Sequence, residues 1–309
     1  MRVINLSDAI DAAPLEGTFL TPAHCRILLQ EDAEVYKPDG SLLLQFHKQV
    51  LPTSACTSAF AALRDFRTYL GGTSNRGVAS GKDPYSGKSA RREVKKDGTI
   101  SKTHRALPTD TTLSGIIGYF DRYTRTPYCR QTAFNLNHPE KFVQCLPLIR
   151  AVDRVFKAGA PERYAAQRAA VERTHPDFTI HGTAFSTITV NYNWQTAVHT
   201  DVGDFRPGFG VLTVLQAGDY DGGVLVFPAY GVGCDIRTGD VLLSDVHEFH
   251  GNTPLCGRGA FIRLSLVLYY RTNMEKCGSA QEELEWAKRR QPGDPLWGPP
   301  RQERAAHGV

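Results

Sequence analysis

The chain has no apolar run that approaches the roughly 20 residues needed to cross a lipid bilayer. Its first eight residues also lack the apolar core of a signal peptide. We therefore expect a protein that is neither secreted nor embedded in a membrane and that works inside a cell, whether it is nuclear, cytoplasmic or viral.

Paired cysteine spacing is missing as well. The seven cysteines are scattered, and no two of them have C-x-x-C spacing. A disulfide framework or a zinc ribbon would show such pairs, so the sequence predicts reduced thiols. The cysteines are Cys25, Cys56, Cys129, Cys145, Cys234, Cys256 and Cys277. The net charge of +4 is too small by itself to indicate a nucleic-acid partner.

Large apolar residues are scarce between residues 71 and 105. From residue 72 to residue 105 there are nine basic and three acidic side chains. Such a segment cannot bury enough apolar surface to fold alone, so we expect a mobile surface loop. It is either a solvated insertion or an arm that contacts the phosphates of a nucleic acid, because clustered Lys and Arg bind that backbone irrespective of sequence.

The pattern of apolar residues changes to that of strands after Gly182. Before that point it predicts short strands in residues 3–46, helices at 54–70, 111–123, 139–157 and 161–173, and a strand at 126–135. Pro147 should kink or split the third of these helices. After that point it predicts strands at 185–194, 210–216, 224–227, 233–236, 240–244 and 260–271, and a last helix at 279–290.

Many short strands preceded by helices predict an α+β fold with a double-stranded β-helix, a jelly roll, as its core. We expect one catalytic domain over residues 1–309. Its parts are an N-terminal supporting region at 1–125, the β-helix core at 126–275, and a C-terminal helix and tail at 276–309.

A metal-binding pattern lies in the strand-rich half of the chain. His199 and Asp201 alternate with one residue, so both side chains point the same way on a strand. A third ligand about fifty residues later is either His250 or His247. His250 is favoured because a Gly-Asn-Thr-Pro turn follows it, whereas His247 sits at the end of a strand. Two histidines and one carboxylate form the facial triad of non-haem Fe(II) oxygenases.

The last predicted strand, residues 260–271, has two different faces. Its even positions are almost wholly apolar, whereas its odd positions include Arg263, Ser265, Tyr269 and Arg271. Polar groups in a strand that otherwise looks buried need partners, and a ligand inside the barrel would supply them. Arg263 would then pair with a carboxylate, and Ser265 could add a hydroxyl. An edge strand with one solvated face is the alternative.

These motifs together resemble the TET and J-binding-protein group of Fe(II)/2-oxoglutarate dioxygenases. The residues that carry the resemblance are His199-x-Asp201, the run from Phe249 to Leu255 and the run from Ile262 to Tyr269. That group oxidises the 5-methyl group of pyrimidines in nucleic acid.

The resemblance implies Fe(II) on His199, Asp201 and His250, and the distal carboxylate of 2-oxoglutarate on Arg263, with O2 as the oxidant. It also implies contacts to the base from Tyr269 and Arg271. Animal TET enzymes have a base-contacting histidine at the position of Arg271, so both thymine and 5-methylcytosine remain open. In duplex DNA the base must be flipped out of the stack, and aromatic side chains near the pocket are candidates to stack on it. These are Tyr192, Trp194, Phe205, Tyr269 and Tyr270.

Four further residues are weaker site candidates. Asn191 either contacts 2-oxoglutarate or is a satisfied strand amide. Asp204 and Arg206 lie in a turn that either faces the substrate or is ordinary turn chemistry. Arg130 is either a buried charge that serves the site or part of a common ion pair.

The sequence therefore predicts a monomeric dioxygenase that hydroxylates a 5-methylpyrimidine in DNA. One alternative is a hydroxylase of the same fold that acts on a protein side chain or a small molecule. Another is a jelly-roll binding module without a metal, although a degenerate site would be expected to lose at least one member of the His/Asp/His and Arg set.

Overall fold

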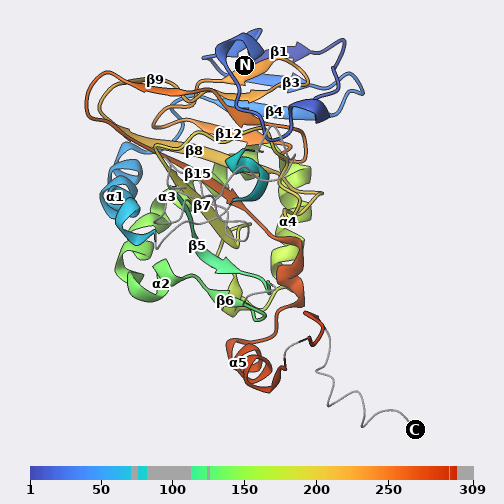
Figure 1. The fold of residues 1–309 in the computed structure, drawn as a ribbon, viewed down its shortest axis with the longest axis vertical. Helices are drawn as coiled ribbons and strands as arrows, with labels where there is room; N and C mark the ends of the chain where they lie inside the picture. Colours follow the sequence, from blue (N-terminus) through green and yellow to red (C-terminus); the bar gives the residue numbers. More distant parts are fainter. Residues whose placement is uncertain (71–75, 82–112, 124–125, 292, 298–309) are drawn as a thin grey trace, which may run out of the picture.

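The computed structural model describes residues 1–70, 76–81, 113–123, 126–291 and 293–297 (Figure 1). Among these residues, nine strands form the main sheet, in the order β1-β3-β4-β12-β8-β15-β7-β5-β6. Their bounds are β1 Arg2–Asn5, β3 Ala33–Tyr36, β4 Leu42–His47, β12 Val241–Ser244, β8 Gly210–Ala217, β15 Ile262–Tyr269, β7 Thr187–Tyr192, β5 Ser114–Phe120 and β6 Arg130–Gln131. The N-terminal strands therefore extend one edge of this sheet, and β8 and β15 lie near its centre.

A smaller sheet packs against part of the main one. It has the order β13-β10-β11-β2, and a separate two-stranded ribbon joins β14 to β9. The bounds are β13 Gly251–Asn252, β10 Leu225–Phe227, β11 Val232–Cys234, β2 Ile27–Leu29, β14 Leu255–Gly257 and β9 Tyr220–Gly222. Leu212 and Leu242 of the main sheet share an apolar core with Phe227 and Val232 of the smaller sheet.

Helices cover the opposite face of the main sheet. Leu63 from α1 and Val152 and Phe156 from α3 pack with Leu243 and Leu266 in the largest apolar core. The α-helices are α1 Thr53–Leu63, α2 Ala133–Asn137, α3 Pro139–Gly159, α4 Pro161–Arg173 and α5 Ala280–Arg289. Short 3-10 helices occur at Ala13–Leu15, Pro22–His24, Phe66–Tyr69, Gly77–Ser80, Pro176–Phe178 and Thr272–Lys276. Two packed sheets with helices on one side confirm the predicted α+β fold with a double-stranded β-helix core.

The apolar and polar side chains of β15 point to opposite faces of the sheet, as their alternation in the sequence predicts. Leu264, Leu266 and Leu268 lie in the helix-covered core. Ser265 and Tyr269 point to the other face and line a cavity. One strand therefore supplies both the centre of the core and one wall of the site.

Leu266→Ala is expected to lower the free energy of unfolding by about 2–5 kcal/mol, because it leaves a cavity in a close-packed core. Leu266 is 1% exposed. Denaturant unfolding monitored by circular dichroism measures the change. Leu284→Ala is the matched control, since Leu284 is 48% exposed on α5. An equal loss in both variants would show that burial in this core is not what stabilises the fold.

Several local predictions need correction. The helix expected at 111–123 is wrong, because residues 114–120 form the strand β5 and pair with β7 in the main sheet. Two glycines and two isoleucines in this stretch disfavour a helix, and strand pairing supplies the backbone hydrogen bonds instead. The strand expected at 126–135 is limited to the two residues of β6, Arg130–Gln131. Helix α2 follows it, with Thr132 as its N-cap.

The predictions for the other helices are largely confirmed. The helix expected at 54–70 ends at Leu63, and a separate 3-10 turn follows. Pro147 does not split α3, which runs from Pro139 to Gly159 as one helix. The last helix, α5, begins with a capping box formed by Ser279 and Glu282.

The prediction of reduced thiols is wrong for one pair. Cys129 and Cys277 form a disulfide, with a Cα–Cα distance of 5.9 Å and 148 residues between them in sequence. The two cysteines pack with α4, Phe178 and Tyr270, and Glu283 accepts hydrogen bonds from the backbone of both Cys129 and Gly278. No spacing rule could have paired them, because their proximity is tertiary.

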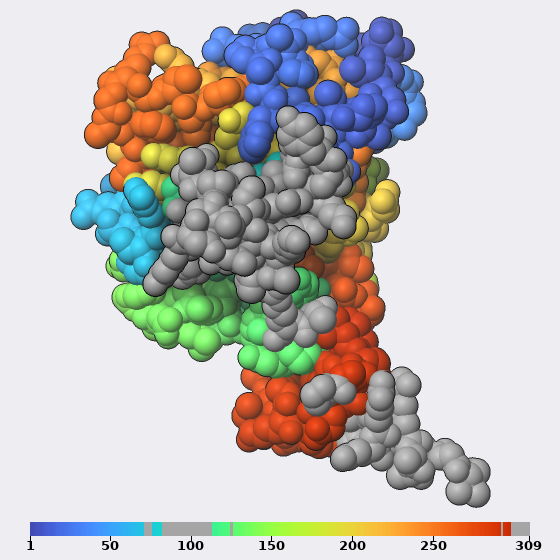
Figure 2. Space-filling view, in the orientation of Figure 1, coloured from blue at the N-terminus to red at the C-terminus, as the bar shows by residue number. Residues whose placement is uncertain are grey.

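The N-terminal strands lie at one end of the molecule's longest axis, and α5 lies at the other end (Figure 1 and Figure 2). No described helix combines the length and apolar character that crossing a membrane requires. The basic segment 71–105 falls outside the described residues except for residues 76–81. Its role, and the division at residues 125 and 275, stay predictions.

Candidate active site

Two histidines and one aspartate meet in a cavity between the two sheets. The ligand atoms of His199, Asp201 and His250 lie within 4.8 Å of one another, and no other such group of His, Cys, Asp or Glu occurs in the described part of the chain. The Nε2 atoms of His199 and His250 lie 3.6 and 3.7 Å from the two carboxylate oxygens of Asp201. This is the donor set of a facial triad, which leaves open positions on a six-coordinate metal.

The backbone fixes both histidines. The N–H groups of His199 and His250 each donate to the carbonyl of the other, at 2.9 and 3.0 Å. The Nδ1 atoms lie 2.8 Å from Ala197 O and 2.9 Å from Glu248 O. A carbonyl only accepts, so each Nδ1 carries a proton, and each Nε2 is the atom that faces Asp201 and is placed to bind a metal. Burial, and then the His199 ring, lower the pKa of His250 to about 4, which keeps this ring neutral at physiological pH.

The competing histidine, His247, lies outside this group. Its Nδ1 atom is 3.2 Å from Asp245 Oδ1, and its Nε2 atom is 3.2 Å from the backbone oxygen of Asp204. His247 therefore supports the loop that carries Asp204 and does not face Asp201.

The cavity has a volume of about 360 Å³. Asn191 and Ser265 line it from the main sheet, and Leu225 and Asn252 line it from the smaller sheet. The metal-binding group therefore opens onto a space walled by both halves of the β-helix. Such a space can hold a small ligand beside the metal.

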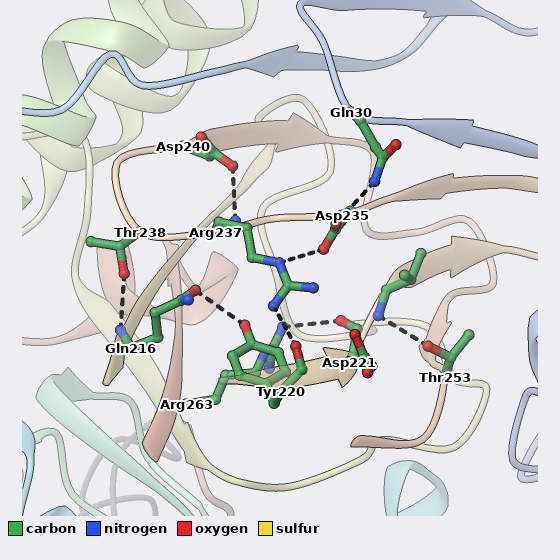
Figure 3. A network of polar contacts seen from close by, with 12 residues as sticks. Gln30, Gln216, Tyr220, Asp221, Asp235, Arg237, Thr238, Asp240, Thr253 and Arg263 are labelled. Atoms are coloured by element: carbon green, nitrogen blue, oxygen red, sulfur yellow. Dashed lines mark hydrogen bonds and ion pairs between the residues drawn. The ribbon is translucent and has the colours of Figure 1, made fainter. Parts of the chain in front are cut away.

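Arg263 is a buried cation two residues before Ser265 on β15, and it is not itself among the lining residues. It lies beside Tyr220 in a polar network that also includes Asp235 and Arg237 (Figure 3). Its Nη2 donates to Gly223 O at 3.1 Å, and its guanidinium contacts the Tyr220 hydroxyl. Its Nε has no hydrogen-bond partner, and no described carboxylate forms an ion pair with it. Nearby Asp235 is engaged by Arg237, at 2.7 Å. Burial lowers the pKa of Arg263, as expected for a cation without a counter-ion.

Ser265 and Asn191 lie side by side on β15 and β7. Asn191 Nδ2 donates to Ser265 Oγ at 3.2 Å. The Ser265 hydroxyl therefore keeps its own proton for another acceptor. Asn191 Oδ1 is buried without a partner. Buried polar groups that the protein itself leaves unsatisfied indicate a ligand or water at this place.

Arg271 is held at the other side of the cavity. Its Nε donates to Asp121 Oδ1 at 2.8 Å, and its guanidinium lies over the Phe120 ring, 4.4 Å from the centroid. Arg130 supports this arrangement from outside the cavity by donating to the backbone oxygen of Asp121 at 3.1 Å. The backbone at Gly203 packs against the same guanidinium, since a Cβ there would lie 2.7 Å from Arg271 Nη1. Arg271 therefore has one fixed position.

Asp204 also lines the cavity. It is 9% exposed, and its Oδ2 has no hydrogen-bond partner. Burial, and then the charge of Asp201, raise the pKa of Asp204 well above its ordinary value. Tyr269 lies nearby with its hydroxyl 3.1 Å from Thr189 Oγ1, and burial raises its pKa to about 12.

Sequence reasoning missed two residues that line the cavity, Phe120 and Arg76, and one residue, Asp121, that holds Arg271. Phe120 and Asp121 were assigned to a helix, and Arg76 was counted with the basic segment. Arg76 lines the cavity and is anchored by hydrogen bonds from its Nε to Ser114 Oγ at 2.8 Å and from its Nη2 to Gly115 O at 3.0 Å. Its charge interacts with Asp201 and Tyr269. No local signal separates Arg76 from the other basic residues around it.

Other predicted residues lie away from the cavity. Arg206 is exposed and lines an adjoining hollow. Tyr192, Phe205 and Tyr270 do not line the cavity, whereas Trp194 and Tyr269 do. Tyr270 is packed beside the Cys129–Cys277 disulfide.

The donor set suits Fe(II) and 2-oxoglutarate. Two neutral imidazoles and a carboxylate are the ligands of a non-haem Fe(II) centre. The uncompensated Arg263 cation, the Ser265 hydroxyl proton and the unpartnered Asn191 amide match the needs of a small dicarboxylate.

The fold is similar to that of a solved structure described as NgTET1 in complex with 5mC DNA. The TM-score is 0.56, and the match covers 84% of this chain and 86% of that chain. The sequences are 12% identical, so this likeness concerns the fold alone. It supports the double-stranded β-helix fold of the core.

The family follows from the sequence comparison. Residues 115–272 match the Tet/JBP family model, described as the oxygenase domain of the 2OGFeDO superfamily. The chain belongs to this family, whose members use Fe(II), 2-oxoglutarate and O2. The resemblance inferred from the HxD, distal histidine and arginine motifs is therefore confirmed, as are the expected cofactors.

Curated relatives carry more specific names. Thymine dioxygenase JBP1 of Trypanosoma brucei brucei is 46% identical over 176 residues, which are 55% of this chain and 20% of that protein. Thymine dioxygenase JBP1 of Crithidia fasciculata is 39% identical over 180 residues, 56% of this chain and 22% of that protein. The bifunctional helicase and thymine dioxygenase JBP2 of Leishmania braziliensis is 38% identical over 184 residues, 59% of this chain and 16% of that protein. The matched part thus spans about a fifth of the relatives' length.

Proposed function

We propose that this protein is an Fe(II)/2-oxoglutarate-dependent dioxygenase that hydroxylates the 5-methyl group of thymine in DNA. The observation that carries the proposal is the His199, Asp201 and His250 group at one cavity, with a buried Arg263 cation beyond Ser265 that lacks a carboxylate partner. The names of the curated relatives support thymine as the base. Activity inside the cell and as a monomer stay predictions.

Bound iron and 2-oxoglutarate together supply the oxidising chemistry, in which O2 provides one oxygen atom to the C–H bond and one to succinate, with release of CO2. The chain's own part is to hold these groups. The two Nδ1–H hydrogen bonds keep both imidazoles oriented for the metal. The Arg263 fork and the Ser265 hydroxyl hold the distal carboxylate of the co-substrate. Arg76, beside Asp201, adds a second positive charge to a site that must accept a dianion.

The opposite side of the cavity is suited to a pyrimidine. Phe120 and Tyr269, at the Arg271 end of the cavity, supply aromatic surface. Thymine has a carbonyl oxygen, O4, beside its 5-methyl group, where 5-methylcytosine has an amino group. A guanidinium only donates, so Arg271 complements the carbonyl and not the amino group. Because the cavity is enclosed by two sheets, a base in a duplex must be flipped to enter it.

The test uses the protein loaded with Fe(II) and 2-oxoglutarate under argon and then exposed to air with oligonucleotides. One oligonucleotide contains thymine and a matched one replaces a thymine by 5-methylcytosine. Nucleoside mass spectrometry should show one added oxygen on thymine, together with succinate. Succinate without a modified base would shift the substrate to a protein side chain or small molecule. No succinate under any condition would contradict the proposal.

Arg271→Met is expected to lower kcat/KM for thymine by roughly 30-fold or more, because a lost charged hydrogen bond costs about 2 kcal/mol or more. The binding of 2-oxoglutarate should change little, since Arg263 lies at the start of β15 and Arg271 lies two residues past its end. Separate titrations of DNA and 2-oxoglutarate measure both effects. Arg64→Met is the matched control, because Arg64 is exposed at the end of α1 and does not line the cavity. Equal effects in both variants would refute the assignment.

A further inference from the structure

An exposed apolar side chain stands at the mouth of the cavity. Val202 directly follows Asp201 and is 88% exposed, the highest value among the exposed large hydrophobic residues of the described chain; the next is Leu136 at 63%. Val202 lines both the cavity and an adjoining hollow of about 210 Å³. A valine so exposed contributes little to the stability of the fold.

The loop that carries Val202 is firmly held. The N–H of Asp201 donates to Val246 O at 3.0 Å, and the N–H of Thr272 donates to Gly203 O at 3.2 Å. The contact of Gly203 with the Arg271 guanidinium leaves no room for another side chain there. The apolar tip therefore projects into solvent from a fixed backbone and not from a freely moving loop.

A positive charge lies beside this tip. Arg206 is exposed four residues further on and lines the same adjoining hollow as Val202. Arg163, from α4, supports the turn with hydrogen bonds from its Nη1 to the backbone oxygens of Arg206 and Pro207, at 3.4 and 3.5 Å. An apolar tip with a cation beside it complements a duplex, in which stacked bases lie between rows of phosphates.

We propose that Val202 enters the DNA duplex and fills the gap that the flipped base leaves in the stack. Val202 directly follows Asp201, so it lies where a base passes from the duplex into the cavity. Apolar side chains that enter a base step compensate for lost stacking. Arg206 binds the neighbouring phosphate. This inference rests on the proposed function, and it names how that function reaches a paired base.

The test compares substrates that need flipping with one that does not. Val202→Ala is expected to lower kcat/KM on duplex thymine roughly tenfold or more, because unstacking is no longer compensated. On the same oligonucleotide as a single strand the change should stay within about twofold, as for an ordinary surface substitution. On a duplex in which the target thymine is mismatched, and therefore already partly unpaired, Val202→Ala should regain most of the lost kcat/KM. Val202→Ile should behave as the wild-type protein does.

Leu136→Ala is the matched control, since it also shortens an exposed apolar side chain but lies on α2. A fluorescent 2-aminopurine beside the target thymine reports unstacking directly, and its signal on binding should fall in Val202→Ala. Equal loss on duplex and single strand, or no loss on duplex, would overturn the inference while leaving the proposed function intact. If the wild-type protein oxidises thymine in neither form, the proposed function is wrong and this inference falls with it.

Discussion

Replacing His250 with alanine is expected to abolish Fe(II) binding and to lower turnover roughly 1,000-fold or more, which corresponds to about 4 kcal/mol. Two ligands cannot hold the metal in the geometry that three ligands fix. The neutral Nε2 of His250 faces Asp201, whereas both ring nitrogens of His247 are engaged by Asp245 and the Asp204 backbone. Fe(II) content after gel filtration under argon, and succinate formation, measure the two effects.

His247→Ala is the matched control for His250→Ala. It removes an imidazole three residues away in the same loop, so general damage to this loop would affect both variants. We expect His247→Ala to retain Fe(II), with at most a moderate loss of activity through the loosened Asp204 backbone. Retention of iron by His250→Ala together with its loss from His247→Ala would reverse the assignment of the third ligand.

Replacing Arg263 with alanine is expected to weaken 2-oxoglutarate binding by about 30-fold to more than 1,000-fold. Truncating one member of a buried charge pair costs about 2–5 kcal/mol. Isothermal titration of the Fe(II)-loaded protein under argon measures the affinity without turnover. Arg263→Lys should recover only part of it, since an ammonium lacks the planar fork that pairs with a carboxylate. Fe(II) binding should persist in both variants.

Arg258→Ala is the matched control, because Arg258 lies five residues earlier and forms an exposed ion pair with Asp221 at 2.8 Å. Such exposed pairs contribute little to stability, so 2-oxoglutarate binding should be unchanged.

Arg263→Met adds an independent test on the ligand-free protein. Removing a buried cation that lacks a carboxylate partner should leave the melting temperature equal or higher. A large drop would mean that Arg263 is structural.

The amino-acid sequence by itself determined the elements and residues whose signals are local. The two-residue alternation of β15 separates Leu264 and Leu266 from Ser265 because a strand turns successive side chains to opposite faces. The HxD spacing places His199 and Asp201 on one side for the same reason. The helices α3, α4 and α5 were predicted from apolar spacing and from prolines and caps at their ends.

Only the tertiary structure decided what depends on partners distant in sequence. Asp121 accepts a hydrogen bond from Arg271, which is 150 residues away in sequence. Cys129 forms a disulfide with Cys277, which is 148 residues away. The strand β5 exists because β7 supplies its hydrogen bonds, and that pairing brings Phe120 to the cavity. Arg76 looks like any other residue of a basic segment until Ser114 and Gly115 hold it beside Asp201. The chemistry of a side chain can be read from its identity, but the place where it acts is set by packing between segments that are far apart in the chain.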